Sequence, residues 1–327
     1  MSSSPDVPAA APPIVTFTLN PALDITTETD TVVHTDKMRC RPPRYDPGGG
    51  GINVARVVHA LGAHSSAVFP AGGPAGKLVT DLVTRAGVPV RRVKISQPTR
   101  ESFTVNEHST GRQYRFVLPG PLLTAAEQTA CLDELQAAAT TADFVVASGS
   151  LPPGIEYDYL QRVADVCRNR GARLILDTSG PALRHLTSGV FLLKPSVREL
   201  RECVGRELET ESEQAAAARE LIDSGCAEVV LVSRGAKGAL LTTADSALRY
   251  EPVVVPVTSG VGAGDAMVAA MTVGLSRGWS LDRSVRLGIA AGAAMLMTPG
   301  TATCMRHDVE RLLDSVPEPV RVDVASR

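Results

Sequence analysis

The sequence predicts an α/β protein in which a mostly parallel sheet carries helices on both faces and a small separate β-sheet is attached. From residue 124 onward, short runs rich in Val, Ile and Leu alternate with amphipathic segments. Such alternation is typical of parallel sheets covered by helices. Two polar, alternating segments at residues 100–106 and 112–118 flank a turn at residues 109–111 and depart from that rhythm. They predict a hairpin outside the main sheet.

Length and charge narrow the range of functions. A chain of 327 residues with 44% hydrophobic content is long enough for one large α/β domain with an appendage, or for two domains. A net charge of -2 gives no general attraction to nucleic acid or to anionic membrane. No apolar run approaches the roughly 20 residues that span a bilayer. We therefore expect a protein without nucleic-acid or membrane partners.

The two ends of the chain differ in composition from the rest. Residues 1–13 are rich in Ser, Pro and Ala and lack the basic start and apolar core of a signal peptide. We expect them to be a flexible tail, and we expect a second loose tail at residues 317–327. Six scattered cysteines without a Cys-x-x-Cys pair argue against zinc sites and disulfides. Neutral thiols in a reducing cytoplasm are the simpler interpretation.

The first predicted strand covers residues 14–19, and Asn20-Pro21 ends it. Asp24 follows just past that end. Because ligand-binding groups gather at the carboxyl ends of parallel strands, Asp24 is a candidate substrate contact. A turn-forming Asp is the alternative.

Basic residues recur at every second position in the next segment, residues 30–47. In a strand, Lys37, Arg39 and Arg41 would share one face. They would either meet an anion there or protect a solvated edge strand. We expect this segment to pair with the hairpin, where Arg100 and Arg115 add two more cations.

Four consecutive glycines, residues 48–51, lead into a helix whose apolar residues recur at helical spacing from Val54 to Leu61. Gly62 ends that helix. Ordering four glycines is entropically costly. The run therefore indicates a backbone that a ligand approaches closely, with Asn53 offering a side-chain amide in the first helical turn.

The remaining elements follow from periodicity and end signals. Thr124 and Glu127 form a capping-box pattern that predicts a helix to about residue 140. Further strands are expected at residues 66–71, 90–95, 144–147, 174–177, 191–193 and 229–232, and further helices at residues 76–87, 157–170, 197–204, 213–224 and 281–297. The last of these is rich in Ala and Gly, which predicts close packing against the helix before it.

The segment Gly-Val-Gly-Ala-Gly-Asp, residues 260–265, opens a helix that ends at Gly278. Unpaired N–H groups at a helix N-terminus suit an anion such as phosphate. Asp265, placed where the loop becomes helix, could remove a proton from an attacking hydroxyl. A simple N-terminal capping role is the alternative.

Three further loops follow predicted strands. Lys194 could reach a nucleotide phosphate and Glu199 could hold Mg²⁺, although Ser196-x-x-Glu199 is also a capping box. The glycines of residues 233–238 would let a base or a phosphate approach, although a tight turn between strands explains them nearly as well. At residues 148–154 a hydroxyl could bind a sugar oxygen, with an ordinary Pro-Gly loop as the competing interpretation.

Taken together, five segments resemble the phosphofructokinase B (PfkB) branch of the ribokinase-like carbohydrate kinases. They are Asn-Pro-Ala-Leu-Asp (residues 20–24), Pro-Gly-Gly-Gly-Gly-Ile-Asn-Val-Ala-Arg (47–56), Gln-Tyr-Arg-Phe-Val (113–117), Ser-Gly-Ser-Leu-Pro-Pro-Gly (148–154) and Val-Gly-Ala-Gly-Asp-Ala-Met (261–267). The likeness extends from residue 14 to about residue 313. Within the branch it is most similar to 6-phosphofructokinases, with Lys37-Met-Arg39-Cys40 and Thr99-Arg100 in the expected places.

The resemblance implies a ribokinase-like, three-layer α/β/α doubly wound fold. The kinase domain would cover residues 14–316, with a β-sheet lid at about residues 24–47 and 98–118. The implied reaction is transfer of a phosphoryl group from ATP, with Mg²⁺, to fructose 6-phosphate. Fructose 1-phosphate and tagatose 6-phosphate are alternative substrates, and a non-catalytic nucleotide- or sugar-binding regulator is a remote alternative. The lid commonly forms a homodimer interface in this family.

The resemblance also implies roles for individual residues. The base would be Asp265, with an anion hole at Gly262, Ala263 and Gly264. Sugar contacts are expected at Asp24, Gly49, Gly50, Asn53 and Ser150, and cations for the substrate phosphate or the lid at Lys37, Arg39, Arg100 and Arg115. Nucleotide contacts are expected at Lys194, Ser196, Ser233, Gly235 and Gly238, with Glu199 at the metal.

Two positions depart from the family pattern. Ser196 stands where the family usually has Asn, and a shorter hydroxyl holds Mg²⁺ and its waters less well. Gly260 stands where the family often has Thr, which removes a hydroxyl and loosens the loop before the anion hole.

Overall fold

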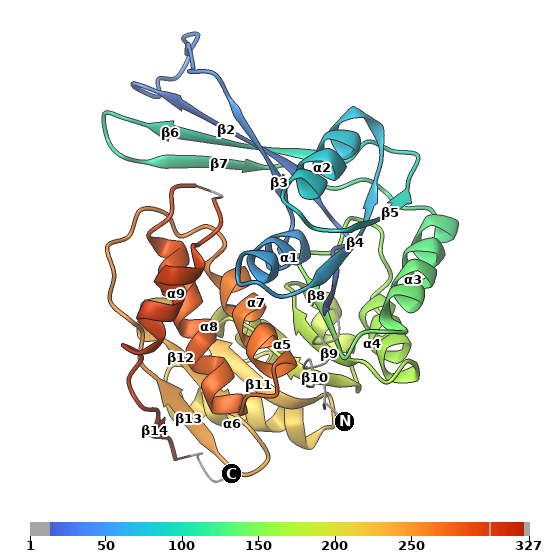
Figure 1. The fold of residues 1–327 in the computed structure, drawn as a ribbon, viewed down its shortest axis with the longest axis vertical. Coiled ribbons are helices and arrows are strands. Elements are labelled where there is room, and N and C mark those ends of the chain that lie inside the picture. The colour runs from blue at the N-terminus through green and yellow to red at the C-terminus, as the bar shows by residue number, and fades with distance from the viewer. Residues whose placement is uncertain (1–13, 301, 324–327) are drawn as a thin grey trace, which may run out of the picture.

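The computed structural model describes residues 14–300 and 302–323 and is built around one ten-stranded sheet (Figure 1). Seven neighbouring strands run parallel from one edge, in the order β5 (Val90–Lys94), β4 (Ser65–Ala71), β1 (Ile14–Phe17), β8 (Phe144–Ser148), β9 (Arg173–Asp177), β10 (Val190–Leu193) and β11 (Ala227–Ser233). The antiparallel strands β12 (Ala239–Thr242), β13 (Ala247–Tyr250) and β14 (Val320–Arg321) extend one edge.

The strand order reverses between β1 and β8. The chain leaves β1 through β4 to β5, and then returns to β8 on the opposite side of β1. In open α/β sheets, ligands bind outside the carboxyl ends of the strands at such a switch point. The topology therefore places the expected site at the ends of β1 and β8.

Helices cover both faces of the sheet, which confirms the predicted three layers. One layer contains α1 (Gly50–Ala60), α7 (Ala263–Ser276), α8 (Leu281–Leu296) and α9 (Arg306–Leu313); the other contains α3 (Ala125–Ala139), α4 (Tyr159–Asn169), α5 (Val197–Val204) and α6 (Glu211–Asp223). The helix α2 (Gly73–Arg85) packs on β4 together with α1. Side chains of β8 alternate between the two cores, because Val145 packs with the second layer and Val146 with the first.

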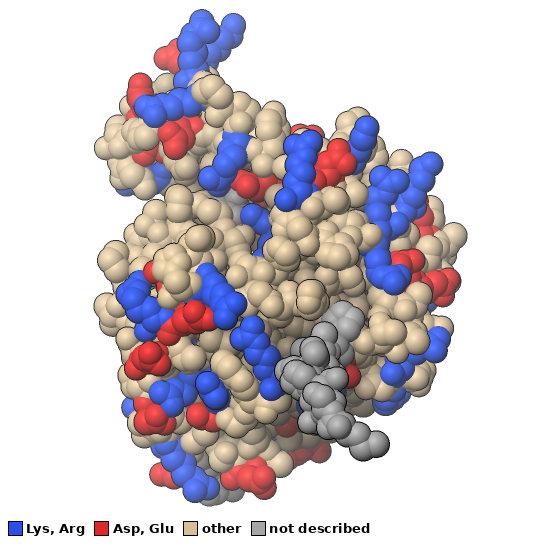
Figure 2. All heavy atoms as spheres, in the orientation of Figure 1, with Lys and Arg blue, Asp and Glu red and all other residues tan. Residues whose placement is uncertain are grey.

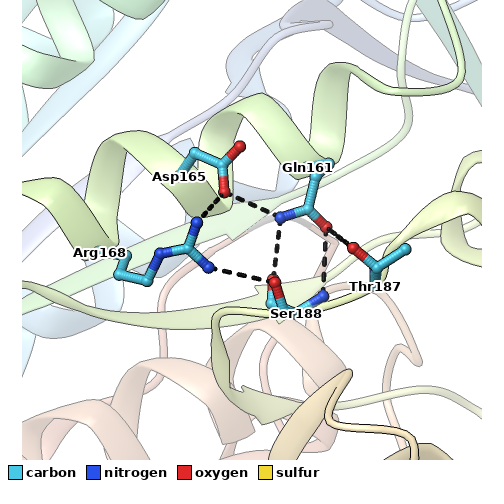
Figure 3. Close-up of polar contacts among 5 residues, drawn as sticks. All are labelled: Gln161, Asp165, Arg168, Thr187 and Ser188. Atoms are coloured by element: carbon cyan, nitrogen blue, oxygen red, sulfur yellow. Dashed lines mark hydrogen bonds and ion pairs between the residues drawn. The ribbon is translucent and has the colours of Figure 1, made fainter.

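Local signals in the sequence explain several helix ends and contacts. Thr124 caps α3 with both bonds of a capping box, as predicted. A side chain at Gly288 of α8 would lie 2.5 Å from Met271 of α7, so these two helices pack as closely as their small residues predicted. Gln161 on α4 accepts hydrogen bonds from the backbone N–H of Thr187 and Ser188, which fixes the loop that leads into β10 (Figure 3).

A four-stranded sheet, which we call the lid sheet, projects from the main body at the top of Figure 1. Its order is β3 (Arg44–Gly48), β2 (Ala22–Thr29), β6 (Arg100–Glu107) and β7 (Gln113–Val117). The β6–β7 hairpin is antiparallel, as predicted. The predicted pairing of this hairpin with residues 30–47 is wrong, because β6 pairs in parallel with β2, and residues 31–43 form no strand. As predicted, no strand continues through Asn20 and Pro21, but the lid strand β2 begins directly after Pro21.

Two further differences concern the C-terminal part. The loose tail predicted from residue 317 is wrong at Val320–Arg321, which form β14 against β13. No sequence pattern predicted β12, β13 or α9, which are short elements of four, four and eight residues. The tail predicted at residues 1–13 lies outside the described residues. Within the described part of the chain, no helix is both long and apolar enough to cross a membrane.

Candidate active site

A cavity of about 250 Å³ lies where the lid sheet meets the switch point of the main sheet. The surface is notched between the lid sheet and the main body (Figure 2). The lid contributes Asp24, Arg100 and Arg115, and the main body contributes Gly49, Asn53, Gly260, Gly262 and Asp265. Residues more than 200 positions apart in the sequence therefore line one cavity, as the motifs predicted.

Asp265 lies in the first turn of α7 without capping that helix. The residue at the N-cap position is Gly262, in a left-handed conformation with φ of 79°, and no side chain caps the helix. The Asn53 Nδ2 group donates a 2.9 Å hydrogen bond to Oδ2 of Asp265, and Ser148 Oγ lies 3.5 Å from Oδ1. The carboxylate is thus oriented by α1 and β8 at the cavity wall, which argues against the simple capping interpretation.

The surroundings of Asp265 make its carboxyl a stronger base than an ordinary aspartate. Burial and, to a smaller extent, the nearby charge of Asp177 raise its pKa to about 7, against the lowering effects of Asn53, Lys194 and Ser148. A carboxylate with a pKa near 7 has about the right proton affinity for a general base at neutral pH.

Asp24 faces the same cavity from the lid sheet. It lies in β2 directly opposite Asp46 of β3, and a side chain on Gly48 would collide with its carboxylate. Burial raises the pKa of Asp24 to about 6, although the Arg100 and Arg115 guanidinium groups lower it. The lid sheet thus contributes one carboxyl group and two cations to the cavity.

The other predicted cations lie elsewhere. Lys37 and Arg39 are exposed in the irregular segment of residues 31–43 and do not line the cavity. The strand face that they were expected to share with Arg41 is not formed, and Arg41 instead pairs with Glu28 at 3.3 Å. Arg100 is held in place by donating to the carbonyl groups of Asn20 and Leu118.

The glycine run is explained by close packing within the protein. A side chain at Gly50 would lie 2.2 Å from Ser148 Oγ, and one at Gly51 would lie 2.5 Å from Thr18 Oγ1. Gly49 has φ of 119°, a conformation that other residues rarely adopt. Close approach of α1 to the ends of β1 and β8 is therefore one reason for these glycines, and Gly49 also lines the cavity, where a ligand can approach it.

Ser150 lies in the loop that follows β8, and it does not line the cavity. Its hydroxyl accepts a 3.2 Å hydrogen bond from Nδ2 of Asn20. The loop after β8 is thereby tied to the first residue of the Asn-Pro-Ala-Leu-Asp segment.

Lys194 lies beside the predicted anion hole. Its Nζ lies 3.0 Å from Oδ1 of Asp177 and 3.7 Å from the place where a side chain at Gly264 would begin. Both partners of this ion pair are largely buried. Asp177 was not predicted as a site residue and Ser148 received no separate role, although Asp177 ends a predicted strand and Ser148 directly follows one, and the carboxyl ends of both strands face the site.

The remaining predicted nucleotide residues gather at an adjacent part of the same sheet edge. Ser196 bridges to Ser233, and Ser196 and Glu199 form a complete capping box for α5. Residues 235–237 form a short turn, and Gly238 packs against the carbonyl of Tyr250. No group of three or more His, Cys, Asp or Glu side chains is arranged to hold a metal within the described residues.

The sequence of this chain matches one family of known proteins and several characterised relatives. The model of the pfkB family of carbohydrate kinases matches residues 18–308. The chain is 66% identical over 311 residues to ATP-dependent 6-phosphofructokinase isozyme 2 of Mycobacterium tuberculosis, covering 95% of this chain and 92% of that protein. It is 39% identical over 301 residues to the isozyme 2 of Escherichia coli, covering 91% and 97%.

Solved structures agree with the sequence comparison. Phosphofructokinase-2 from Escherichia coli in complex with fructose-6-phosphate superimposes with a TM-score of 0.87 at 37% identity, over 93% of this chain and 99% of that one. The tetrameric inhibited form of the same enzyme gives the same values. Ribokinase of Arabidopsis thaliana shares the fold, with a TM-score of 0.73 at 22% identity over 93% and 99%.

Proposed function

Because this chain belongs to the pfkB family of carbohydrate kinases, we propose that it transfers the γ-phosphoryl group of ATP to the C1 hydroxyl of fructose 6-phosphate. One observation carries the proposal beyond the family likeness. The cavity has a carboxylate with raised pKa at the start of α7 and two guanidinium groups on the lid sheet. A phosphorylated sugar can therefore present a hydroxyl to Asp265 while its own phosphate meets Arg100 and Arg115.

In the proposed reaction, Asp265 accepts the proton of the C1 hydroxyl. The freed oxygen attacks the γ-phosphorus, and the bond from that phosphorus to the bridging oxygen breaks, which releases ADP. The backbone N–H groups of residues 262–264 and the Lys194 ammonium face the negative charge that spreads over the moving phosphoryl group. The hydrogen bond from Asn53 keeps the carboxylate of Asp265 aimed at the hydroxyl.

On the substrate side, Asp24 would accept a hydrogen bond from a sugar hydroxyl, and Arg100 and Arg115 would bind the sugar phosphate. Lys37 and Arg39 could join them only if residues 31–43 or a second subunit carried them to the cavity. Closure of the lid sheet would exclude water and so suppress hydrolysis of ATP.

On the nucleotide side, the loops at Ser196, Ser233, Gly235 and Gly238 form one continuous edge beside Lys194, which supports their role in ATP binding. A kinase site usually holds Mg²⁺ through one or two carboxylates and the substrate phosphates. Glu199 fits such a site, since a second carboxylate, Asp177, lies near enough for Glu199 to raise its pKa. When bound, Mg²⁺ would neutralise phosphate charge.

The lid sheet also supports homodimer formation. The sheet exposes Phe103, Phe116 and Val117 at 39%, 57% and 62% of their surfaces, which is unusual for large apolar side chains on one small sheet. The Escherichia coli relative is described in a tetrameric inhibited form. We place the enzyme in the cytoplasm, where ATP and sugar phosphates are present.

A coupled assay that reports ADP release tests the substrate assignment directly. The purified chain would be supplied with ATP, Mg²⁺ and, separately, fructose 6-phosphate, tagatose 6-phosphate and fructose 1-phosphate. We expect the highest kcat/KM with fructose 6-phosphate. A higher value with another sugar would transfer the assignment to that substrate, and ligand binding without ADP release from any of the three would support a regulator.

A further inference from the structure

Two buried charges, the Lys194 ammonium and the Asp177 carboxylate, meet behind the anion hole, and the proposed reaction does not explain why they pair with each other. Asp177 ends β9 and Lys194 directly follows β10, and these neighbouring parallel strands place Leu176 beside Leu193. The Lys194 side chain is 5% exposed and that of Asp177 is 14% exposed. A buried charge is tolerated when it is paired, and their 3.0 Å contact provides that pairing.

The geometry also shows which carboxylate Lys194 does not pair with. Its ammonium lies close to Gly264, the residue before Asp265. Within the described chain, however, the carboxylate of Asp265 contacts Asn53 and Ser148, and the ion pair of Lys194 is made with Asp177. The cation is therefore held near the base without neutralising it.

We propose that Asp177 is a positioning residue that holds the Lys194 ammonium beside the anion hole and keeps it from pairing with the carboxylate of Asp265. This rests on the proposed function, since it assigns the base to Asp265. Without Asp177, the flexible ammonium would turn to the nearest remaining carboxylate. It would then compete for the proton acceptor and leave its place beside the phosphoryl group.

The electrostatics of the pair agree with this arrangement. Burial alone would lower the pKa of Lys194, but the charge and hydrogen bond of Asp177, together with the charges of Asp265 and Glu199, raise it above its ordinary value. The groups that face Asp265 from the packed elements are Asp177 on β9, Lys194 after β10, Asn53 on α1 and Ser148 on β8, and only the first two carry charge.

The proposal predicts opposite shifts for two single variants. Asp177→Asn removes a negative neighbour and frees the ammonium to approach Asp265, so the acid limb of the kcat/KM profile should move to lower pH by about one unit. Lys194→Met removes a positive neighbour and leaves Asp177 unbalanced, so the limb should move to higher pH by a similar amount. The double variant should lie between them, and all three should turn over more slowly.

A second readout does not depend on turnover. Carbon-13 labelling of the Asp carboxyl groups, with the Asp265 signal assigned by its loss in Asp265→Asn, reports the titration midpoint of that group by NMR. The midpoint should fall in Asp177→Asn and rise in Lys194→Met. Failure of the proposed function would appear as absence of turnover on every sugar phosphate, while this titration would still be measurable.

Asp165→Asn is the matched control, because Asp165 forms an ion pair with Arg168 on α4, away from the cavity (Figure 3). It should leave the profile and the Asp265 midpoint unchanged. If Asp177→Asn fails to fold on its own, the double variant with Lys194→Met, which removes both buried charges, replaces it. The titration midpoint of Asp265 must then be lower in the double variant than in Lys194→Met alone. Slower turnover with an unmoved midpoint, or shifts of both single variants in one direction, would overturn the proposal.

Discussion

At the scale of single residues, the function depends on a carboxylate that stays basic at neutral pH. Replacing Asp265 with Asn keeps the size of the side chain and the acceptor for Asn53 but removes the proton acceptor. We expect turnover to fall by about 10²–10⁴, with ATP affinity nearly unchanged. Steady-state kinetics and calorimetric titration with ATP check this. A loss of only a few-fold would mean that the carboxylate is not the base.

The raised pKa of Asp265 has a consequence for stability. The folded protein binds this proton more tightly than the unfolded chain does, because burial raises the pKa from 3.8 to about 7. The stability that this provides is fully present below pH 3.8 and is lost as the pH rises through 7. Asp265→Asn should therefore raise the Tm relative to wild type more at pH 8 than at pH 5, in thermal unfolding followed by circular dichroism.

The variant Asp165→Asn provides the comparison for this measurement, since Asp165 is half-exposed and lies outside the cavity. Its Tm difference from wild type should not grow between pH 5 and pH 8. If the Tm difference between Asp265→Asn and wild type were equally independent of pH, the carboxyl group of Asp265 would have the pKa of an ordinary aspartate.

At the scale of elements, the contact of α1 with β1 and β8 fixes Asn53 and, through it, Asp265. A side chain at Gly51 would lie 2.5 Å from Thr18 Oγ1 and 2.8 Å from the carbonyl of Phe17. Gly51→Ala should therefore displace the start of α1 and lower the free energy of unfolding by about 1–3 kcal/mol, as overpacking does. Chemical denaturation measures this change, and kcat should fall with it because Asn53 moves.

Gly260 offers the matched control for that substitution. It stands in the loop before the anion hole, its φ is not in the left-handed region, and a side chain there would meet nothing within 4 Å. Gly260→Ala should change the unfolding free energy by less than about 0.5 kcal/mol. If the two variants lost equal stability, close approach would not be the reason for the glycines.

The same elements show how far sequence alone leads. Periodicity predicted α5 at its observed bounds and the capping box predicted the start of α3, because both signals are local. The meeting of Asp24, Asn53 and Asp265 in one cavity followed from motifs known to occur together. The parallel pairing of β2 with β6 and the ion pair of Asp177 with Lys194 depend on segments far apart in the chain, which no local pattern encodes.

At the scale of the whole molecule, the lid sheet has two faces with different tasks. Residues alternate between them, so that Asp24 faces the cavity while its neighbour Ile25 points the other way. Registers across the four strands place Tyr45, Ile25, Phe103 and Phe116 in one row, of which Phe103 and Phe116 also border the cavity. Tyr45, Phe103 and Phe116 of this row are exposed to water, and exposed apolar side chains gathered on one sheet are typical of a surface that a second protein covers.

We expect this row to hold two chains together, and one charge within it to separate them. Phe116→Glu should convert the protein from a dimer to a monomer of 34.3 kDa in size-exclusion chromatography with light scattering, without unfolding it, because Phe116 is already 57% exposed. Sugar phosphate KM should rise as the lid loses its support, while ATP affinity is retained. Met305→Glu, at 56% exposure next to α9, is the control and should remain dimeric. A Phe116→Glu protein that keeps the wild-type mass would place the interface elsewhere and leave the exposed row of the lid sheet without a partner.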